Sequence, residues 1–280
     1  MRRFWKLILR DRLAAIGLVI VVLLAVVALW PAAWLPANPT RANPALRLKP
    51  PVFAGGTWGH ALGTDNLGRD LLSRTVAGTK VSVVIALVAV LISATLGIGL
   101  GVAAGYFGGA VDSLIMRLVD IQLAFPLLLL IIAVIAVVGS SLPILILLLG
   151  ISGWAQYARL VRAETLRVRA QEFVEASRAL GTGSLRLVVK HVLPNVSTTI
   201  IVVGTFEIAR VFLLESAVSF LGLGVQPPTP SWGTMIADGR DYVYEGWWIA
   251  TVPGVAIVLA VLAFNFLGDG LRDVLDPKTR

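Results

Sequence analysis

The sequence predicts an all-α membrane protein with six transmembrane helices, and two observations carry this prediction. Hydrophobic residues make up 57% of the 280 residues and charged residues only 14%, whereas a soluble domain is about 45–50% apolar and about 25% charged. The apolar residues also form uncharged blocks of roughly 20 residues, the length of helix that crosses about 30 Å of hydrocarbon. This composition argues against a soluble enzyme or a free DNA-binding protein.

Each apolar block is bounded by prolines, glycines or charged residues. We expect helices near residues 13–34, 81–105, 113–138, 143–160, 197–221 and 247–267. The first block follows a basic stretch, but its apolar part exceeds the roughly 7–15 residues of a cleaved signal peptide, so we expect a retained helix. A Gly-Ser-Ser-Leu-Pro turn at residues 139–143 divides the third block from the fourth, because its proline favours the start of a new helix.

The distribution of Lys and Arg predicts the orientation, because cytoplasmic loops carry the excess of positive charge. With the N-terminus inside, about 16 of the 24 Lys and Arg residues fall on the cytoplasmic side. We therefore expect both termini in the cytoplasm. The first outer loop is nevertheless basic, since it holds Arg41, Arg47, Lys49, Arg69, Arg74 and Lys80. The net charge of +8 is explained mainly by topology and needs no nucleic-acid partner.

Three connections are longer than simple turns. Residues 35–80 form an outer loop rich in Pro and Gly, and residues 222–246 form a second outer segment, expected over the outer mouth of the bundle. Tryptophans in and after this segment are open to a second interpretation as anchors at the membrane interface: Trp232, Trp247 and Trp248. The third connection, near residues 161–195, is cytoplasmic and is expected to be folded.

The cytoplasmic connection is predicted to contain two short helices. Residues 171–180 have the apolar spacing of one helix face, and Gly181 stands where helices commonly end in a left-handed residue. Ser184 is a candidate N-cap for a second helix at 185–192, which Pro194 would end. The two helices either insert into a groove on a soluble partner or pack only on the chain's own membrane helices.

The same connection resembles the EAA loop of ABC-importer permease subunits. The family pattern is Glu-Ala-Ala, three residues, Gly, nine residues and Ile-x-Leu-Pro, and the corresponding positions are Glu175, Ala176, Ser177, Gly181, His191, Leu193 and Pro194. The chain departs from the pattern at Ser177 and His191. The second departure is similar to peptide-type members, which often read Arg-His-x-Leu-Pro-Asn at this place.

Three further blocks resemble the C-type permease subunits of dipeptide, oligopeptide and nickel importers. The first precedes the second expected helix and contains Gly63, Thr64, Asp65, Gly68, Arg69 and Asp70. The second covers residues 215–233, and the third covers residues 265–277. With the EAA loop they span nearly the whole chain in one order, so the four blocks together are more specific than any one alone.

This resemblance implies the type I ABC-importer permease fold and a subunit of a heteromeric importer in the cell inner membrane. The implied partners are a second, homologous permease subunit, two cytosolic ATPases that bind the EAA loops, an extracytoplasmic binding protein and the lipid bilayer. The solute is expected to be a di- or oligopeptide, with nickel or glutathione as alternatives. The chain lacks the Gly-x4-Gly-Lys-Ser/Thr phosphate loop. ATP and magnesium are therefore expected on the partner ATPases, with no cofactor and no catalysis on this chain.

The resemblance also divides the chain in two. Residues 1–80 are expected to hold the N-terminal cytoplasmic segment, the first helix and the outer loop, and residues 81–280 the five-helix permease domain with the coupling loop at about 161–195. The hypothesis for mechanism is that closure of the ATPase pair moves this loop as a rigid body. The shared pathway would then alternate between inward-facing and outward-facing states, which requires a different contact in each state.

Charged residues inside the expected helices are functional candidates, because charges at membrane depth are costly and often functional. Glu207 and Arg210 are three residues apart and can pair on one helix face. Arg117 and Asp120 have the same spacing at the inner start of the third helix, and Glu215 lies nearer the outer end of the fifth. These residues either line a water-filled pathway or subunit interface, or they form structural pairs that fix helix rotation.

A repeat of small residues marks the second expected helix. Gly97, Gly101 and Gly105 recur at intervals of four, which is typical of a helix face that packs closely on another helix in a membrane. The repeat does not follow a strand and does not match a dinucleotide-binding fingerprint.

Two rival functions remain as alternatives. Residues 150–153 read Gly-Ile-Ser-Gly, the form found in intramembrane serine proteases, but the nucleophile Ser152 needs a base within reach. The only histidines, His60 and His191, fall in loops on opposite sides of the membrane in this topology. A secondary transporter or channel would commonly show inverted repeats, which the sequence does not display. The absence of Cys and of metal-ligand spacing around either His argues against a metal site.

Overall fold

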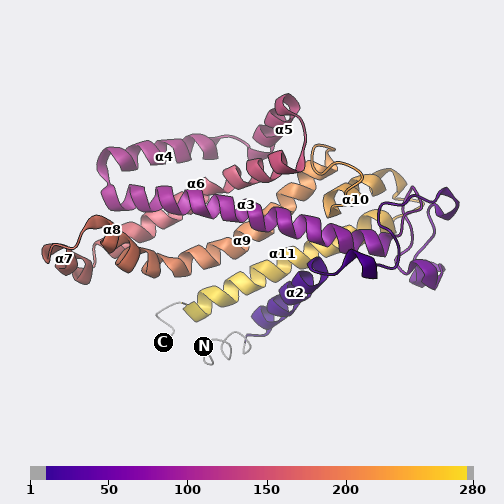
Figure 1. Ribbon diagram of the computed structural model, residues 1–280, viewed down its shortest axis with the longest axis horizontal. Helices are drawn as coiled ribbons and strands as arrows, with labels where there is room; N and C mark the ends of the chain where they lie inside the picture. Colours follow the sequence, from indigo (N-terminus) through magenta and orange to yellow (C-terminus); the bar gives the residue numbers. More distant parts are fainter. Residues whose placement is uncertain (1–10, 276–280) are drawn as a thin grey trace.

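The computed structural model describes residues 11–275, which form helices and loops without a named β-strand. Figure 1 shows an elongated helical bundle. Its helices are α2 (Arg12–Ala28), α3 (Leu71–Phe107), α4 (Gly109–Ala124), α5 (Leu127–Val138), α6 (Leu142–Arg169), α7 (Glu172–Ala179), α8 (Ser184–Leu187), α9 (Leu193–Phe220), α10 (Trp232–Gly239) and α11 (Trp248–Leu275). The all-α prediction is confirmed for this part of the chain.

The six expected spans all correspond to helices, but not all are simple crossings. Four helical segments of the described chain are long and apolar enough to cross a membrane: α3, α6, α11 and the continuous segment Ser184–Phe220 that contains α8 and α9. The helices α4 and α5 make a fifth span only as a pair, because they meet at an 85° bend. The first expected span is the shorter apolar helix α2, which has 17 residues.

Helix α3 begins at Leu71, well before the expected residue 81. The carboxylate of Asp70 accepts a hydrogen bond from the backbone N–H of Ser73 and so caps the first turn. The uncharged apolar block in the sequence begins only at residue 81, so it did not predict the first turns of the helix, which contain Arg74 and Lys80. Residue 80, the expected division of the chain, therefore lies inside α3. Helix α6 likewise continues past residue 160 to Arg169.

The expected helix at 113–138 is broken in the middle. Phe125 has extended backbone angles between α4 and α5, and Pro126 follows it as the N-cap of α5. Proline disfavours the helical conformation of the preceding residue and has no N–H for the helix ladder. The apolar pattern alone did not reveal this bend, although Pro126 was the available signal.

The glycine repeat holds α3 against α6, as predicted. A Cβ added at Gly97 would lie 2.3 Å from Cβ of Tyr157, and one at Gly101 would lie 2.7 Å from the carbonyl oxygen of Ala158. At Gly105 it would lie 2.7 Å from Cβ of Thr165. Rising numbers on α3 meet rising numbers on α6, so the two helices run in the same direction (Figure 1).

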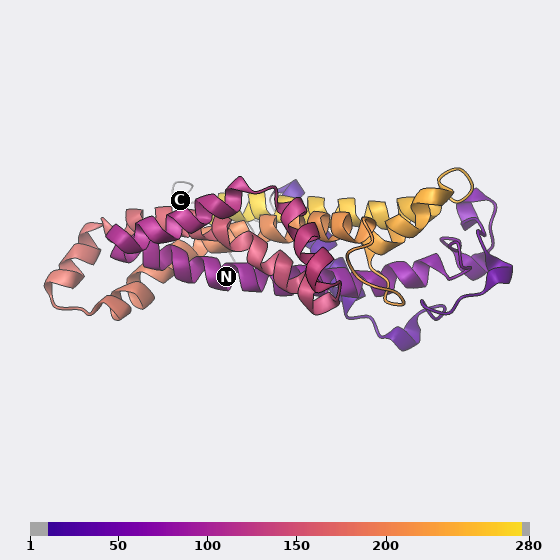
Figure 2. The same cartoon turned by 90° about the horizontal axis from the view of Figure 1, so that it is seen from above.

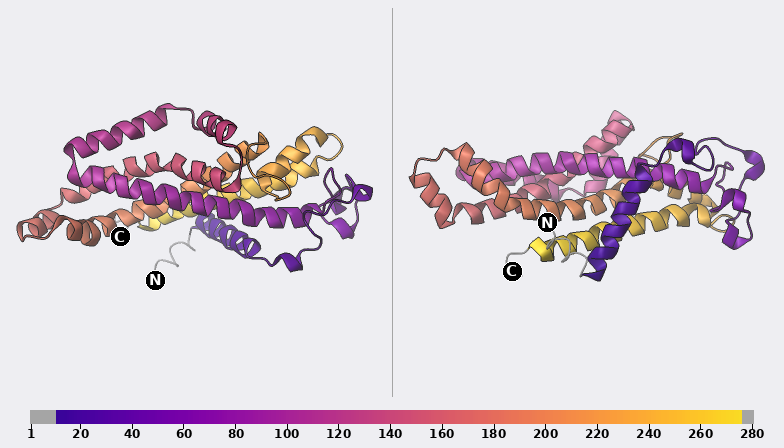
Figure 3. Two further views of the ribbon diagram at one scale, coloured as in Figure 1. Left: turned by 45° about the horizontal axis from the view of Figure 1, so that its top comes forward. Right: turned by 60° about the horizontal axis from the view of Figure 1, so that its bottom comes forward.

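Helix α2 crosses α11 in the opposite direction (Figure 3). Gly17 faces the backbone of Ala263 and Leu267, and Gly270 faces Ala14. The beginning of α2 therefore lies beside the end of α11. This places the first and last described helical residues toward the same side of the bundle.

The largest apolar cluster joins side chains of α2, α3, α5, α6, α9 and α11 with Trp232 of α10. Trp232 at the start of α10 is only 1% exposed and stacks on Phe212, with ring centroids 5.6 Å apart. Trp248 is 6% exposed and donates its indole N–H to the carbonyl oxygen of Thr64. The alternative interpretation of Trp232 and Trp248 as interface anchors is therefore wrong, because both rings are core. Trp247 is 42% exposed.

The two ends of the bundle carry different structures. Figure 2 shows α7 and α8 at one end of the long axis, and the α2–α3 segment at the other end, with α10 on that side. The segment 222–231 is not helical, as its prolines and glycines predict, and α10 packs on α9, α11 and the start of α3. The bundle thus has one end built from short helices and one from a long loop with α10.

Candidate functional site

Helices α7 and α8 with the π-helical turn that follows, residues 172–192, are called the α7–α8 turn. Its first half has the structure that the sequence predicts. Helix α7 ends at Ala179, and Gly181 follows with φ of +81°. The N–H of Gly181 donates to the carbonyl of Arg178 at 2.9 Å, and the N–H of Thr182 donates to the carbonyl of Ser177 at 3.1 Å. These two bonds are a Schellman motif, which favours glycine because of its left-handed residue.

The second half of the turn differs from the prediction in two ways. Gly183, not Ser184, is the N-cap of α8. Pro194 does not end the helix, since α8 continues through a π-helical turn at Val188–Val192 into α9. Pro194 lies in the first turn of α9, directly after the π-helical turn, and proline is tolerated in the first turn of a helix. Helix α8 is consequently continuous with α9.

One face of the α7–α8 turn is fastened to the bundle by apolar contacts. Val174, Leu187 and Val192 are at most 1% exposed. They pack in one cluster with apolar side chains from α3, α6 and α9: Val102, Tyr106, Val161, Val168 and Val196. The guanidinium of Arg178 lies 5.7 Å from the ring centroid of Tyr106, at the end of α3. Movement of the turn therefore requires movement of the ends of α3, α6 and α9.

The opposite face of the turn is exposed and partly apolar. Leu180 is 87% exposed and Leu185 is 78% exposed. Glu175, Ala176 and Gly181 are also exposed. His191 lies beside Phe173, with ring centroids 5.8 Å apart, and Leu193 is half-buried. One face of the turn therefore packs on the chain's own helices, and insertion of the other face into a groove on a soluble partner stays a prediction.

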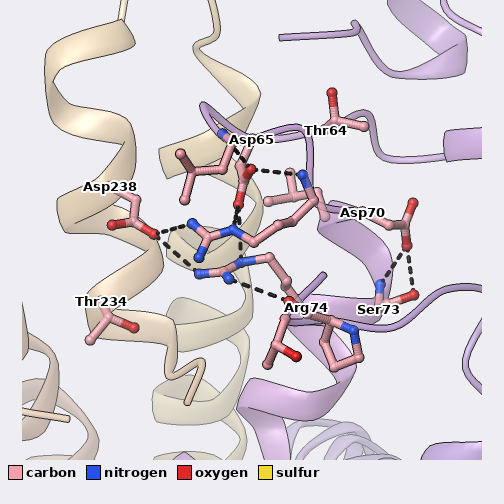
Figure 4. Close-up of polar contacts among 12 residues, drawn as sticks. Thr64, Asp65, Asp70, Ser73, Arg74, Thr234 and Asp238 are labelled. Carbon is pink, nitrogen blue, oxygen red and sulfur yellow. Dashed lines mark hydrogen bonds and ion pairs between the residues drawn. The ribbon is translucent and has the colours of Figure 1, made fainter. Parts of the chain in front are cut away.

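A second predicted motif forms a buried ionic cluster at the other end of the molecule (Figure 4). Asp65 is 1% exposed and accepts a bond of 2.6 Å from Nε of Arg69. Its other oxygen accepts the backbone N–H groups of Leu67 and Arg69. Arg69 and Arg74 both donate to one oxygen of Asp238 on α10, at 3.0 and 3.1 Å. The cluster ties the outer loop to α10.

The remaining motif residues shape the loop around this cluster. Thr64 accepts the backbone N–H of Lys49 at 2.8 Å, and its hydroxyl donates to the carbonyl of Leu46. Asp70 accepts from Ser73 and lies 2.9 Å from Nδ1 of His60. Gly63 and Gly68 have φ of +81° and +71° and lie against the backbone of Lys49 and Asn43. Only glycine fits such positions without strain.

These pairs also explain why the first outer loop is basic. Two of its six arginines and lysines, Arg69 and Arg74, are paired with Asp65 and Asp238. Sequence reasoning missed Asp238, which lies 164 residues from Arg74 in the chain. No motif in the sequence marks that carboxylate, because its partners are distant in sequence.

Within the bundle, Glu207 and Arg210 pair as predicted. Nε of Arg210 donates to Glu207 at 2.8 Å, and its Nη2 donates to the other carboxylate oxygen. Nη2 also lies 3.4 Å from the hydroxyl of Ser152 on α6. Glu207 is 3% exposed, whereas the side chain of Arg210 is 24% exposed. The pair therefore joins α9 to α6, and the guanidinium of Arg210 stays partly exposed.

Glu215 stands apart from this pair. It is 1% exposed, and its carboxyl group accepts a bond of 2.8 Å from the hydroxyl of Ser219, with Ser82 of α3 at 3.5 Å. The hydroxyl of Ser219 in turn accepts the backbone N–H of Val225. Glu215 thus lies among hydroxyl groups that join α9 to α3 and to the outer segment.

The predicted pairing of Arg117 with Asp120 is wrong. Asp120 instead accepts a bond of 2.6 Å from Arg159 of α6, and both side chains are largely exposed. Arg117 is exposed on α4. Side chains three residues apart can pair on a helix, but α6 lies alongside α4 and offers a competing cation.

The geometry around Ser152 does not fit a protease. Its hydroxyl donates to the carbonyl of Leu149 at 2.6 Å. His60 lies beside Asp70 at the outer end, and His191 lies beside Phe173 in the α7–α8 turn. A nucleophilic serine needs a base within hydrogen-bond reach, and neither histidine of the chain is near it. Within residues 11–275, no group of three or more His, Cys, Asp or Glu side chains is placed to hold a metal ion.

A family model described as "Binding-protein-dependent transport system inner membrane component" matches residues 97–280. The chain belongs to this family. It is therefore a membrane component of a transport system and not an enzyme. The match begins inside α3 and includes the α7–α8 turn and α9, so the predicted family is confirmed on the part of the chain that holds the coupling motif.

Similarity to relatives extends over the whole chain. It is 43% identical to the "Di/tripeptide transport system permease protein DppC" of Pseudomonas aeruginosa, over 100% of this chain and 93% of the relative. It is 42% identical to the "Dipeptide transport system permease protein DppC" of Escherichia coli K12, over 100% and 94%. The protein of the same name from Haemophilus influenzae is 39% identical, over 100% and 95%.

A solved structure supports the fold. A chain from the inward-facing MetNI methionine ABC transporter superposes with a TM-score of 0.58 at 19% identity, covering 74% of this chain and 98% of that chain. At this identity the similarity speaks for the fold alone. The predicted type I ABC-importer permease fold is thereby confirmed.

Proposed function

We propose that this chain is a permease subunit of an ATP-driven importer that carries di- or oligopeptides. The observation that carries the proposal is the full-length similarity to three permeases named for dipeptide or di- and tripeptide transport. The family places the chain in a binding-protein-dependent system. Such a system implies an extracytoplasmic binding protein that delivers the solute. We further propose that a second, homologous permease subunit completes the pathway.

The α7–α8 turn is proposed to be the contact for the cytosolic ATPases. Its exposed face offers Leu180 and Leu185 to a groove on a soluble partner. Its buried face is packed on α3, α6 and α9. Displacement of the turn by an ATPase would therefore displace these three membrane helices. ATP and magnesium belong to those partners. Within this scheme Glu175 gives a directional polar contact, and Gly181 sets the angle between α7 and α8.

The proposed orientation places α7 and α8 in the cytosol and the Asp65–Asp238 cluster outside. Support comes from the predicted excess of Lys and Arg on the α7–α8 side and from the position of the two features at opposite ends of the bundle (Figure 2). Both termini then lie toward the cytosol, since α2 begins beside the end of α11. The protein is a multi-pass component of the inner membrane in this scheme.

The test of this function is transport by the intact complex. The permease pair and ATPases are reconstituted in vesicles, and a radiolabelled dipeptide is supplied with the binding protein. We expect ATP-dependent uptake of the dipeptide. Uptake of nickel or glutathione without uptake of peptides would contradict the proposed solute, and uptake without ATP or without the ATPases would contradict the proposed mechanism.

A variant of the turn separates coupling from folding. Gly181 has a left-handed backbone and an open surround, with nothing within 4 Å of an added Cβ. Gly181→Asp is expected to leave an inserted permease that fails to bind ATPase or fails to use its hydrolysis for uptake. Gly109→Asp is the matched control, because Gly109 also has positive φ and open space but lies outside the turn. Normal uptake by Gly181→Asp would contradict the coupling role.

A further inference from the structure

The exposed surface of the bundle is not uniform. On α2, α3 and α11 it consists mainly of aliphatic side chains, such as Leu23 at 59%, Leu91 at 66% and Val258 at 56% exposed. Such surfaces suit lipid chains. The face between α6 and α9 differs, because polar and charged side chains recur along both helices there.

A groove of about 490 Å³ runs along this face toward the end of α11. Residues of α6, α9 and α11 line it, the polar ones being Glu164, Arg167, Asn195, Thr198, Thr199 and Arg272. Glu164 and Arg167 form an ion pair of 2.7 Å at the groove, so both signs of charge are present. Apolar side chains such as Leu160 and Phe206 complete the walls.

The polar character continues beyond the groove toward the middle of the bundle. Gln156 lies one turn before Leu160 on α6 and is exposed. Arg210 lies one turn after Phe206 on α9, and its bonds to Glu207 use only Nε and Nη2. Polar and ionisable side chains at this depth face a water-filled space or another protein surface rather than lipid.

We propose that the α6–α9 groove, continued by Gln156 and Arg210, is a water-filled wall of the solute pathway. The proposal rests on the proposed function as an importer subunit and adds which face of the chain the solute passes. A peptide has amide groups and two charged ends. The amide, hydroxyl and oppositely charged side chains of this face can form hydrogen bonds that replace those between the peptide and water. Among the described residues, this face has no deep pocket that would retain the peptide.

The absence of cysteine in the chain makes the proposal directly testable. Single variants Gln156→Cys and Thr199→Cys report on the groove, while Leu91→Cys and Val258→Cys report on the aliphatic surface. Each is placed in the intact complex in vesicles and treated with a charged methanethiosulfonate, which attaches to a thiolate through a new disulfide and releases sulfinate. Modification is read on this chain by mass spectrometry.

We expect Gln156→Cys and Thr199→Cys to react at least about tenfold faster than the two control variants, because an apolar environment raises the thiol pKa and depletes the thiolate. Equal, slow reaction at all four positions would overturn the proposal and indicate that lipid or the second permease covers this face. Attachment of the charged group to Gln156→Cys is also expected to reduce dipeptide uptake while ATP hydrolysis continues. Unchanged uptake after complete modification would likewise overturn the proposal.

These outcomes are distinguishable from failure of the proposed function. If the complex transports a solute other than a peptide, the reactivity of the four thiols is unaffected and the proposed pathway stands. If peptides are transported but the thiols react equally, the function stands and the pathway lies on another face.

Discussion

The two ends of the bundle are held by opposite kinds of contact. At the proposed outer end, Asp65, Asp238 and two arginines form an ionic cluster between the α2–α3 loop and α10. At the proposed inner end, Val174 and Leu187 fasten the α7–α8 turn mainly by apolar packing. Buried ion pairs require one geometry and are costly to break, whereas apolar contact is non-directional. The outer end suits a fixed shape, and the inner end suits a segment that moves with its helices.

Helix α3 connects the two ends. Arg74 at the end of its first turn belongs to the outer cluster, and Tyr106 in its last turn belongs to the inner cluster. The glycine repeat between them fixes α3 to α6. The comparison therefore predicts that substitutions at the outer end unfold the protein, while substitutions on the free inner face change only its partnership.

The largest effect is expected from Asp65→Ala. The change removes the more deeply buried of the two carboxylates that Arg69 and Arg74 share and leaves them only Asp238. Breaking a buried pair costs about 3–5 kcal/mol. Thermal unfolding of the purified complex, followed by tryptophan fluorescence, measures the loss. Asp120→Ala is the matched control, because its partner Arg159 is exposed and such surface pairs contribute about 0–1 kcal/mol. Similar losses of stability for the two variants would contradict the claim that the ionic cluster makes the outer end rigid.

A smaller loss is expected from Gly97→Ala. Its new Cβ would meet Tyr157 at 2.3 Å, and forcing extra atoms into a packed contact costs about 1–3 kcal/mol. Gly99→Ala is the control, since nothing lies within 4 Å of its added Cβ and Ala is the better helix former by about 1 kcal/mol. Opposite signs of the stability change are expected in the same unfolding measurement. If both variants stabilise the protein, α3 and α6 are not in close contact.

The inner cluster is expected to be sensitive to Val174→Ala. Val174 is fully buried under the turn, and the lost methyl groups and the cavity they leave cost about 1–2 kcal/mol. Protection of α7 amides from hydrogen exchange is expected to fall while that of α10 stays unchanged. Equal loss of protection at both ends would show that the two ends unfold together.

The smallest effect on stability is expected from Leu180→Ser. This side chain is 87% exposed, and surface substitutions away from special features stay within about 0.5 kcal/mol. ATPase retention during purification is nevertheless expected to fall, because the apolar face of the turn is weakened. Leu13→Ser, at an exposed position on α2, controls for general loss of apolar surface. Full ATPase retention by Leu180→Ser would contradict the proposal that the ATPase binds the exposed face of the turn.

Much of the fold was predictable because membrane helices are marked by long apolar blocks. Caps and breaks were less so: Asp70 caps α3 at Leu71, well before the expected residue 81, and Pro126 breaks a span whose apolar pattern is continuous. Local pairs such as Glu207 with Arg210 follow from helix spacing. Distant pairs do not, because the partnership of Arg74 with Asp238 depends on how α10 folds over α3.

The same contrast applies to the α7–α8 turn. Gly181 and its left-handed backbone follow from one residue in one position. The continuation of α8 into α9 through Pro194 does not, because it runs through the π-helical turn that precedes the proline. The sequence also did not predict which apolar residues of the turn are buried. Val174 and Leu185 are both apolar, but Val174 is buried and Leu185 is exposed.

The central claim is that the free face of the α7–α8 turn receives force from a cytosolic ATPase. A photo-crosslinking amino acid at Leu185, which is 78% exposed, tests it most directly in the membrane-embedded complex. The account predicts a crosslinked product that contains this chain and an ATPase subunit. A product with the extracytoplasmic binding protein, or a turn that is digested only by protease added from outside the cell, would contradict the account.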